Sequence, residues 1–396
     1  MRKFVRCAKD ALAVVTVCVG AGFATGREIY LFFARYGAAG LAGCAAAALL
    51  AGGIFLGAMR AAKQWNAAEI TTLCKRAAGG RAGRLAALFY GALLCAAGGA
   101  MLAATGEAFA LMLPVCRAYG LGKSSGSSTV SSMMLPVCRA YGLGMALTAA
   151  ACFLLRGCGL EPLAWVGALL APCCAALFAM ILRAPVAERT RPWLTAEPSL
   201  PRAMLAAACY ASFNAAFCTG ALCEIGMRRN EEEHGLISAQ AALCIGALLA
   251  LGCTALYRHG ESVRYAPLPV VALSRAFGAT GYWLCAAALL AAVVTSYGAS
   301  VRALARMIPA KFGERTAWIL ALAATAAAAR LRLDGIIGGL YPLLGALCLL
   351  CFLTILLKTV IVRSRLGQKG AVYSVASEQG RSVKPNGSDQ NSAASP

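Results

Sequence analysis

The sequence predicts an all-α integral membrane protein, with ten transmembrane helices in a 5+5 inverted repeat and discontinuous helices 1 and 6. Of its 396 residues, 60% are hydrophobic and 13% are charged, whereas soluble domains average ~45–50% and ~25%. Ten apolar runs follow one another along the chain, and their lengths repeat in the same order in each half. A single apolar core stops growing beyond ~250–300 residues. This composition therefore excludes a soluble enzyme, and it also excludes a disordered regulator.

The ten runs are the predicted spans, because a helix crosses the bilayer with ~20 apolar residues. The runs cover 11–34, 38–59, 85–111, 143–155, 162–182, 203–225, 236–257, 279–301, 316–329 and 335–361. The fourth and ninth are short and are followed by Arg156 and Arg330, which can reach the interface. We expect both to span, although runs of this length also occur as re-entrant segments.

The order of lengths predicts an internal repeat. Each half reads long, long, long, short, long, and amphipathic connectors at 63–80 and 262–276 occupy matching places. Five spans per half is an odd number, so repeat two (203–361) enters the membrane from the side opposite to repeat one (8–182). Such inverted repeats occur in many secondary transporters. Coincidence in a ten-run pattern is the alternative.

Positive charge sets the predicted orientation. Cytoplasmic loops of membrane proteins carry an excess of Lys and Arg. With both termini in the cytoplasm, 23 of the 37 Lys and Arg residues fall in cytoplasmic segments, which agrees with this rule. The segment 183–202 holds four arginines and disagrees. The net charge of +21 thus indicates a lipid bilayer as partner, and we expect no nucleic-acid partner.

Two segments are expected to lie outside the membrane. Residues 362–396 contain a Ser-, Gly- and Asn-rich stretch that is typical of a disordered cytoplasmic tail. The motif MLPVCRAYGLG occurs at 112–122 and again at 134–144, and we interpret 112–144 as a duplicated external loop within a transmembrane domain of residues 1–361. The duplication is either a binding hairpin or a slippage event, which long loops tolerate at little cost.

The first run contains three closely spaced glycines that predict a break in its helix. Within the bilayer an unwound stretch is tolerated only where it faces protein or a water-filled cavity, and such breaks build solute and ion sites. Close packing of small residues against a neighbouring helix is the alternative. The candidate substrate-binding residues here are Gly20, Ala21, Gly22, Phe23, Thr25 and Gly26.

Arg27 and Glu28 follow this glycine-rich stretch directly. Ionisable residues within a span mark functional sites, so both are candidate coupling residues. Adjacent helical residues do not face each other, and each therefore needs its own partner. The alternative is that both side chains reach water at the interface.

The sixth and eighth runs carry polar residues within apolar sequence. Tyr210, Ser212 and Asn214 in run six are further candidate substrate-binding residues, if this helix is also interrupted; interhelical hydrogen bonding is the alternative. In run eight, the Ala292 carbonyl and the Thr295 and Ser296 hydroxyls share one helix face. Neutral oxygen ligands suit a hard cation such as Na⁺, although such hydroxyls often bond to their own helix.

A family resemblance rests on the segment GAGFATGREIYLFFARYG, with weaker support from GAMLAATG at Gly99–Gly106, from YASFN at 210–214 and from IGGLYPLLG at Ile337–Gly345. Over residues 8–361 the chain resembles the YkvI-type bacterial membrane proteins of the amino acid–polyamine–organocation superfamily. The resemblance implies the leucine-transporter architecture, a bacterial cytoplasmic membrane, and backbone carbonyls of Thr16 and Val19 as further Na⁺ ligands. Two features depart from the family pattern: Arg27 replaces a usual Gln, and the duplicated loop is extra.

We therefore expect a secondary active transporter of a small polar solute, an amino acid or a related amine, coupled to Na⁺ or H⁺. The coupling ion is the only cofactor expected. A receptor that keeps the transporter fold and binds its ligand without moving it is the alternative. We expect no enzyme, because His234 and His259 are the only histidines and offer no metal-ligand spacing. The solute and the oligomeric state are not determined by the sequence.

Overall fold

The computed structural model describes residues 2–112, 130–157, 160–185, 199–264, 266, 268–331 and 343–359. Every regular element within these ranges is a helix, so the all-α class is confirmed. The expected tail at 362–396 lies outside the described residues, as does most of the first motif copy at 112–122.

Helices lie in each of the ten apolar runs, over the part of each run that the structure describes. The α-helices are α1 (Arg2–Cys18), α2 (Ala21–Ala24), α3 (Arg27–Phe32), α4 (Ala38–Gln64), α5 (Ile70–Ala78), α6 (Gly80–Met112), α8 (Val130–Leu154), α9 (Leu160–Arg183), α10 (Leu200–Arg228), α11 (Glu231–Arg258), α12 (Gly260–Arg264), α13 (Pro269–Ser274), α14 (Gly278–Met307), α15 (Glu314–Ala328) and a C-terminal helix, Leu343–Thr359. Short 3₁₀ turns are η1 (Ala34–Tyr36), η2 (Leu155–Gly157), η4 (Arg275–Phe277), η5 (Ala310–Phe312) and η6 (Ala329–Leu331).

Six helical segments in the described ranges are long and apolar enough to cross a membrane: Ala38–Gln64, Gly80–Ala110, Arg139–Gly157, Leu200–Arg228, Glu231–Arg258 and Pro269–Met307. The outward faces of these helices carry large apolar side chains, for example Leu49 at 78% exposure and Leu243 at 76%. Lipid tails accept such side chains, whereas water does not. Length, composition and surface together indicate a membrane-embedded protein.

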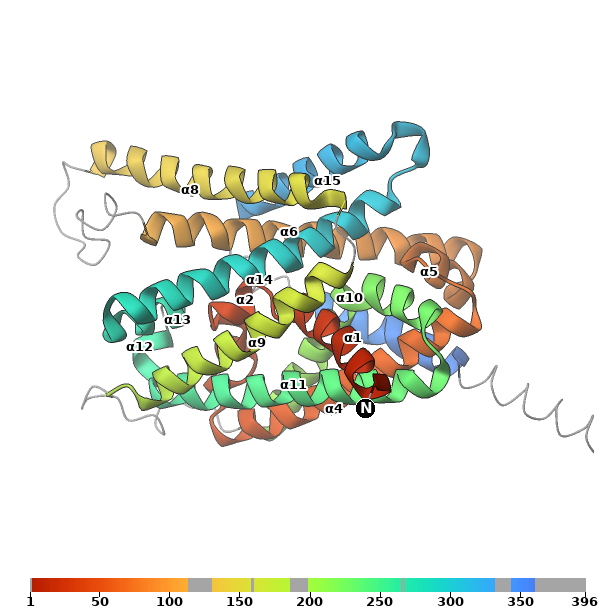
Figure 1. The fold of residues 1–396 in the computed structure, drawn as a ribbon, viewed down its shortest axis with the longest axis horizontal. Helices are drawn as coiled ribbons and strands as arrows, with labels where there is room; N and C mark the ends of the chain where they lie inside the picture. The colour runs from red at the N-terminus through yellow and green to blue at the C-terminus, as the bar shows by residue number, and fades with distance from the viewer. Residues whose placement is uncertain are drawn as a thin grey trace, which may run out of the picture.

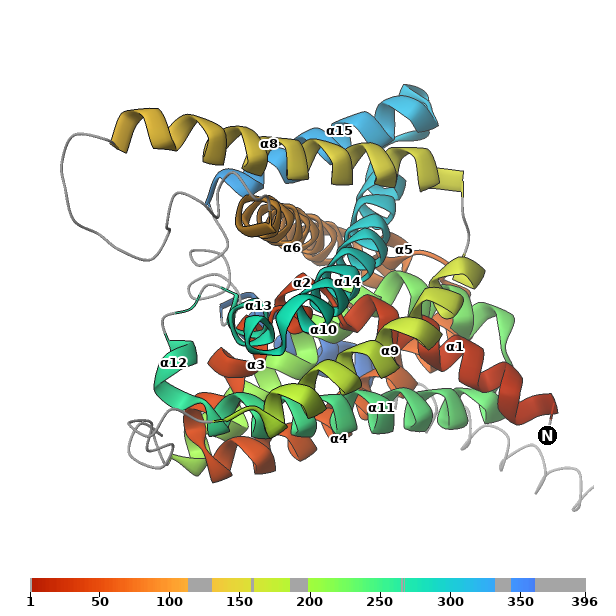
Figure 2. The ribbon, with the colours of Figure 1, turned by 60° about the vertical axis from the view of Figure 1, so that its left-hand side comes forward.

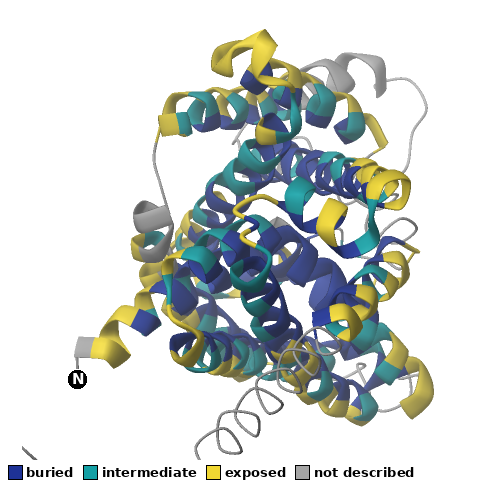
Figure 3. Ribbon diagram, turned by 90° about the vertical axis from the view of Figure 1, so that its right-hand side faces the viewer, coloured by how far each residue is buried: buried dark blue, intermediate teal, exposed yellow. Residues whose placement is uncertain are grey.

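The bundle is built around α10, whose most apolar stretch is 72% buried. On one side of the molecule lie α4 and α11; on the other, α6 carries α8 and α15, while α14 crosses between the two groups (Figures 1 and 2). The peripheral α8 is only 22% buried over its apolar stretch. Buried residues concentrate along the inner helices and exposed ones on the outer faces (Figure 3). The first helix runs through this central region beside α10 and α14.

The second copy of the repeated motif is helical, which corrects the loop predicted at 112–144. Residues 134–144 lie within α8, which begins at Val130. They pack on α6: a Cβ at Gly106 would lie 2.7 Å from the Tyr141 ring, and one at Gly144 would lie 2.8 Å from Phe109. The motif contains one Pro and two Gly, which disfavour helix, so the packing against α6 accounts for its helical state. Run four is therefore not short, so one support for matching lengths in the two halves is wrong.

Candidate functional site

The first helix is broken twice at its glycine-rich stretch. After α1 ends at Cys18, the chain forms the four-residue α2 and then α3, which begins at Arg27. Gly26 lies between them with φ 79°, a left-handed conformation that costs other residues ~1–2 kcal/mol. The interruption predicted for helix 1 is thus present.

Residues of α13 cover the second break. The Val270 amide donates a hydrogen bond to the Thr25 carbonyl (2.9 Å), and the Thr25 hydroxyl donates to the Gly22 carbonyl (3.0 Å). A Cβ at Gly26 would lie 2.8 Å from Val270 Cγ2, so only glycine permits this approach. Backbone groups released by the break are therefore satisfied by protein, as burial requires.

Arg27 and Glu28 point to different partners, as their adjacency predicts. The Arg27 guanidinium donates to the carbonyl of Arg264 (3.0 Å), the last residue of α12, and to that of Ala266 (3.4 Å) just beyond it. Glu28 is 5% exposed and folds back over α2. A Cβ at Gly22 would lie 2.1 Å from Glu28 Oε1, so the missing side chain of Gly22 makes the space for this carboxylate.

The first break lies against α6 and α14. A Cβ at Gly20 would lie 3.1 Å from Met101 Cε and 3.4 Å from Ser296 Oγ. Ser296 donates to the Ala292 carbonyl, and Thr295 donates to the carbonyls of Ala291 (2.8 Å) and Ala292 (3.2 Å). The structure thus brings Ser296 to the break, with both hydroxyls bonded within their own helix.

The remaining predicted Na⁺ ligands lie at the end of α1. Thr16 is in its last turn and donates its hydroxyl to the Leu12 carbonyl (2.7 Å). Val19 follows the helix and donates its amide to the Val15 carbonyl (2.8 Å). Both residues are buried.

The interruption predicted for helix 6 is wrong, because α10 is continuous over 29 residues. Ser212 donates to the Gly345 carbonyl of the C-terminal helix (2.7 Å), and the Asn214 amide donates to the Tyr210 carbonyl of its own helix (3.0 Å). These polar side chains saturate carbonyls and leave the helix intact. Ser212 and Asn214 are brought to other partners, not opposite the break.

Tyr210 meets the broken helix through an aromatic cluster. Its ring lies 5.4 Å from that of Phe32 and 5.0 Å from that of Phe33, at the end of α3. The Phe213 ring lies 5.4 Å from Tyr210 and 5.2 Å from Phe217. Offset and edge-on rings at these distances pack favourably. The face of α10 towards α3 is therefore aromatic rather than hydrogen-bonding.

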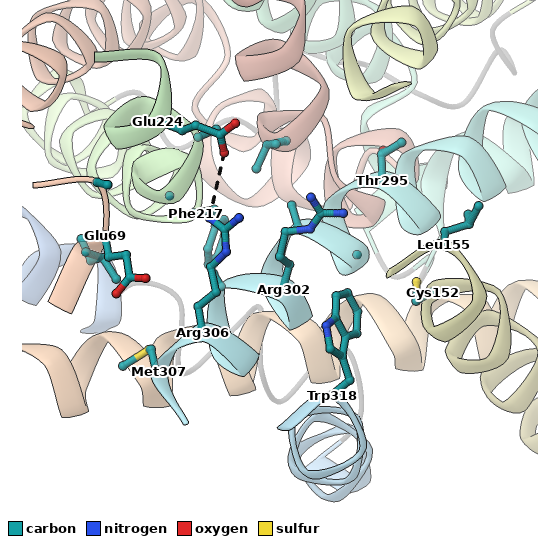
Figure 4. Close-up of a pocket in the computed structure, with 18 of the residues that line it drawn as sticks. Glu69, Cys152, Leu155, Phe217, Glu224, Thr295, Arg302, Arg306, Met307 and Trp318 are labelled. Carbon is teal, nitrogen blue, oxygen red and sulfur yellow. Dashed lines mark ion pairs between the residues drawn. The ribbon is translucent and has the colours of Figure 1, made fainter. Parts of the chain in front are cut away.

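Beside the first break lies a cavity of about 170 Å³ (Figure 4). Its walls come from α1, α5, α8, α9, α10, α14 and α15, and the lining residues include Val17, Phe217, Thr295, Gly298 and Trp318. Thr295 is the only residue of the predicted site among those that line this cavity. The predicted residues of α2 and α3 do not contribute to its wall.

Four charged residues at the cavity were not singled out from the sequence: Glu69, Glu224, Arg302 and Arg306. Arg306 extends from α14 towards Glu224 on α10 (Figure 4), with 3.9 Å between the charged atoms. The four charged residues come from three separate parts of the chain. The only hint of these residues in the sequence is their position, because each lies at or beyond the end of an apolar run.

The cavity extends towards the end of the molecule that holds the N-terminus. Ion pairs fix this end: Asp10 of α1 pairs with Arg228 (2.8 Å) and Arg229 (2.6 Å) where α10 ends, and Arg6 pairs with Glu233 of α11. Glu224 and Arg306 lie near the same helix ends. The wall thus runs from the level of the break to the N-terminal face.

The fold and site define an all-helical membrane protein with a broken first helix and an adjacent cavity that carries both charge signs. Comparison with protein-family models and with curated proteins finds no match to this sequence.

Proposed function

We propose that the protein is a secondary active transporter that moves a small polar solute, an amino acid or a related amine, by alternating access. The observation that carries this proposal is the double break in the first helix, together with the cavity that Val17, just before the first break, helps to line. Breaks within a span are tolerated where they serve a site, and transporter sites are built at such breaks. The breaks also supply hinges about which α1 could move relative to α10.

The chemistry of the cavity supports the solute class. Apolar side chains form most of the wall, while Glu224 and Arg306 place opposite charges side by side. Pockets of this kind bind small molecules through shape and orient them through a few polar groups. An amino acid carries an ammonium, a carboxylate and an apolar side chain, which suit these three surfaces.

A 5+5 inverted repeat is part of the proposal. The short α5 lies between α4 and α6, and the short α12 and α13 lie between α11 and α14, at matching places in the two halves. The paired helices α4 and α11 have 27 and 28 residues, and α6 and α14 have 33 and 30. The unbroken α10 is the main departure from symmetry.

The expected setting is the bacterial cytoplasmic membrane with both termini inside, in line with the charge distribution and the YkvI-type resemblance. In that orientation the cavity faces the cytoplasm. A transporter needs no catalytic residues and no nucleic-acid partner.

Uptake by the purified protein in liposomes tests the proposal. A thermal-shift screen of amino acids and their decarboxylated amines first identifies a ligand, because binding stabilises the folded state. The stabilising compound is then supplied in labelled form, with empty liposomes as control. Accumulation inside the vesicles supports transport. Binding without accumulation supports the receptor alternative, and no binding by any compound rejects the proposed solute class.

Coupling to Na⁺ or H⁺ is tested with two variants. Thr295 and Ser296 offer neutral oxygens beside the break, which suit Na⁺, whereas Glu28 can carry a proton. Under Na⁺ coupling, ligand binding strengthens with Na⁺ at fixed ionic strength, the variant T295V/S296A loses this dependence and E28Q keeps it. Binding that ignores Na⁺ but follows pH, with the response lost in E28Q, assigns coupling to Glu28.

A further inference from the structure

Two pairs of buried cysteines lie in mutual contact within the bundle. Cys18 Sγ lies 3.2 Å from Cys218 Sγ, and this pair joins the last residue of α1 to α10. Cys44 of α4 lies within hydrogen-bonding reach of Cys253 of α11. A disulfide has a length of ~2.05 Å, so the first pair needs a small approach of its sulfur atoms to bond.

The two pairs differ in their access to the cavity. Val17 and Phe217, which directly precede Cys18 and Cys218, both line it. All four cysteines are buried, but neither Cys44 and Cys253 nor their chain neighbours are among its lining residues. A small molecule in the cavity therefore comes within one residue of the first pair only.

We propose that Cys18 and Cys218 form a redox-active dithiol, which a small uncharged oxidant such as hydrogen peroxide converts into a disulfide between α1 and α10. One thiolate attacks the peroxide: its O–O bond breaks, an S–O bond forms, and the leaving hydroxide takes up a proton to give water. The second thiol sulfur attacks this sulfenic acid, forms the S–S bond and releases a second water. Two thiols are oxidised and one peroxide is reduced to two waters.

The position of the pair gives the modification a consequence. Cys18 ends α1 immediately before the first break, so a covalent bond there fixes α1 to α10 at the hinge. Oxidation then holds one arrangement of the two helices, and thiol reductants release it. This effect on uptake rests on the proposed transport function, whereas formation of the disulfide does not.

Peptide mapping of the full-length protein in detergent tests the inference. The protein is treated with hydrogen peroxide, its remaining thiols are alkylated, and it is digested with trypsin. Cleavage after Lys9, Arg27, Arg202 and Arg228 places Cys18 in peptide 10–27 and Cys218 in peptide 203–228. Fragmentation of the linked peptide identifies the bonded cysteine, because 203–228 also holds Cys209 and Cys223.

The expected result is a linked peptide through Cys18 and Cys218, removed by dithiothreitol and absent from C18S and C218S. The matched control C223S alters a buried thiol of the same helix and keeps the link. Cys44 and Cys253 remain alkylatable under the same treatment. The inference is overturned if no such peptide forms while the half-buried Cys173 and Cys244 are oxidised, or if Cys44 and Cys253 link as readily.

The same preparations in liposomes address the consequence. Peroxide should abolish uptake by the wild type and by C223S, with recovery on reduction, and should leave C218S active. A linked peptide in a protein that never accumulates solute would reject transport and leave the dithiol standing. Uptake unaffected by a complete link would reject the hinge lock.

Discussion

The broken first helix and the continuous α10 run side by side through the core, but their backbones differ: the first is interrupted twice and the second is not. Three glycines within seven residues let α1, α2 and α3 separate. The space is occupied by side chains of α6, α11, α13 and α14 and by Glu28 of α3. In α10 the polar residues Ser212, Asn214 and Thr219 each bond to a carbonyl of their own helix. Missing side chains thus open the first helix, whereas polar side chains that bond to carbonyls of their own helix leave α10 continuous.

The largest effect is expected from G22L, which places a side chain where the Glu28 carboxylate now lies. We expect loss of solute binding, because Glu28 and α3 must move, while insertion into the membrane is kept. Thermal shift with the identified ligand measures this. The matched control is G53L, since a Cβ at Gly53 meets nothing within 4 Å. Unchanged affinity in G22L would separate the break from the binding site.

A smaller loss is expected from G26A. Both Gly26 and Gly79 have positive φ, with ψ −3° at Gly26 and −176° at Gly79, and alanine in such sparsely populated conformations costs ~1–3 kcal/mol. At Gly26 the new methyl group also meets Val270, whereas at Gly79 it meets open space. We therefore expect the thermal midpoint of G26A to fall below that of G79A. Equal midpoints would show that α13 does not hold the break.

D10N tests how α1 is anchored to the unbroken helix. It weakens the hydrogen bonds to Arg228 and Arg229, and hydrogen bonds to charged groups contribute about 1.5–3 kcal/mol. The control E232Q alters an ion pair with Lys3 in which both side chains are exposed, and such pairs contribute about 0–1 kcal/mol. Denaturant unfolding in detergent should rank D10N as the less stable variant; the reverse order would contradict the anchor.

The smallest effect is expected from S212A. Its interhelical hydrogen bond reaches Gly345, and such bonds average ~0.6 kcal/mol in a membrane protein. Solute affinity should stay the same, because Ser212 lies away from the break. A strong loss of solute affinity without loss of stability would show that α10 contributes to the binding site. The functional difference between the broken first helix and α10 would then not hold.

Features with a local cause were predictable from the sequence. The break follows from Gly20, Gly22 and Gly26, because glycine acts on its own backbone. The separate directions of Arg27 and Glu28 follow from helix geometry. Composition and run length gave the all-helical class and the apolar helices.

Features with a distant cause were not predictable. Nothing within run six shows that the Ser212 hydroxyl will reach Gly345, 133 positions later. The cavity combines Glu69 with Glu224 and Arg306, which meet only when α5, α10 and α14 pack. The helical second copy of the repeated motif depends on Gly106 and Phe109 of α6 as its partners.

The contacts of the break also bear on how the protein is assembled. Arg27 is held by the carbonyl of Arg264, 237 positions downstream, and the Thr25 carbonyl by the Val270 amide. When the ribosome has made the first span, neither partner exists, and unsatisfied backbone groups are costly in lipid. The span synthesised first can be completed only after α12 and α13 emerge. During most of translation, the insertion machinery or neighbouring helices must therefore keep the broken middle of the first span out of contact with lipid.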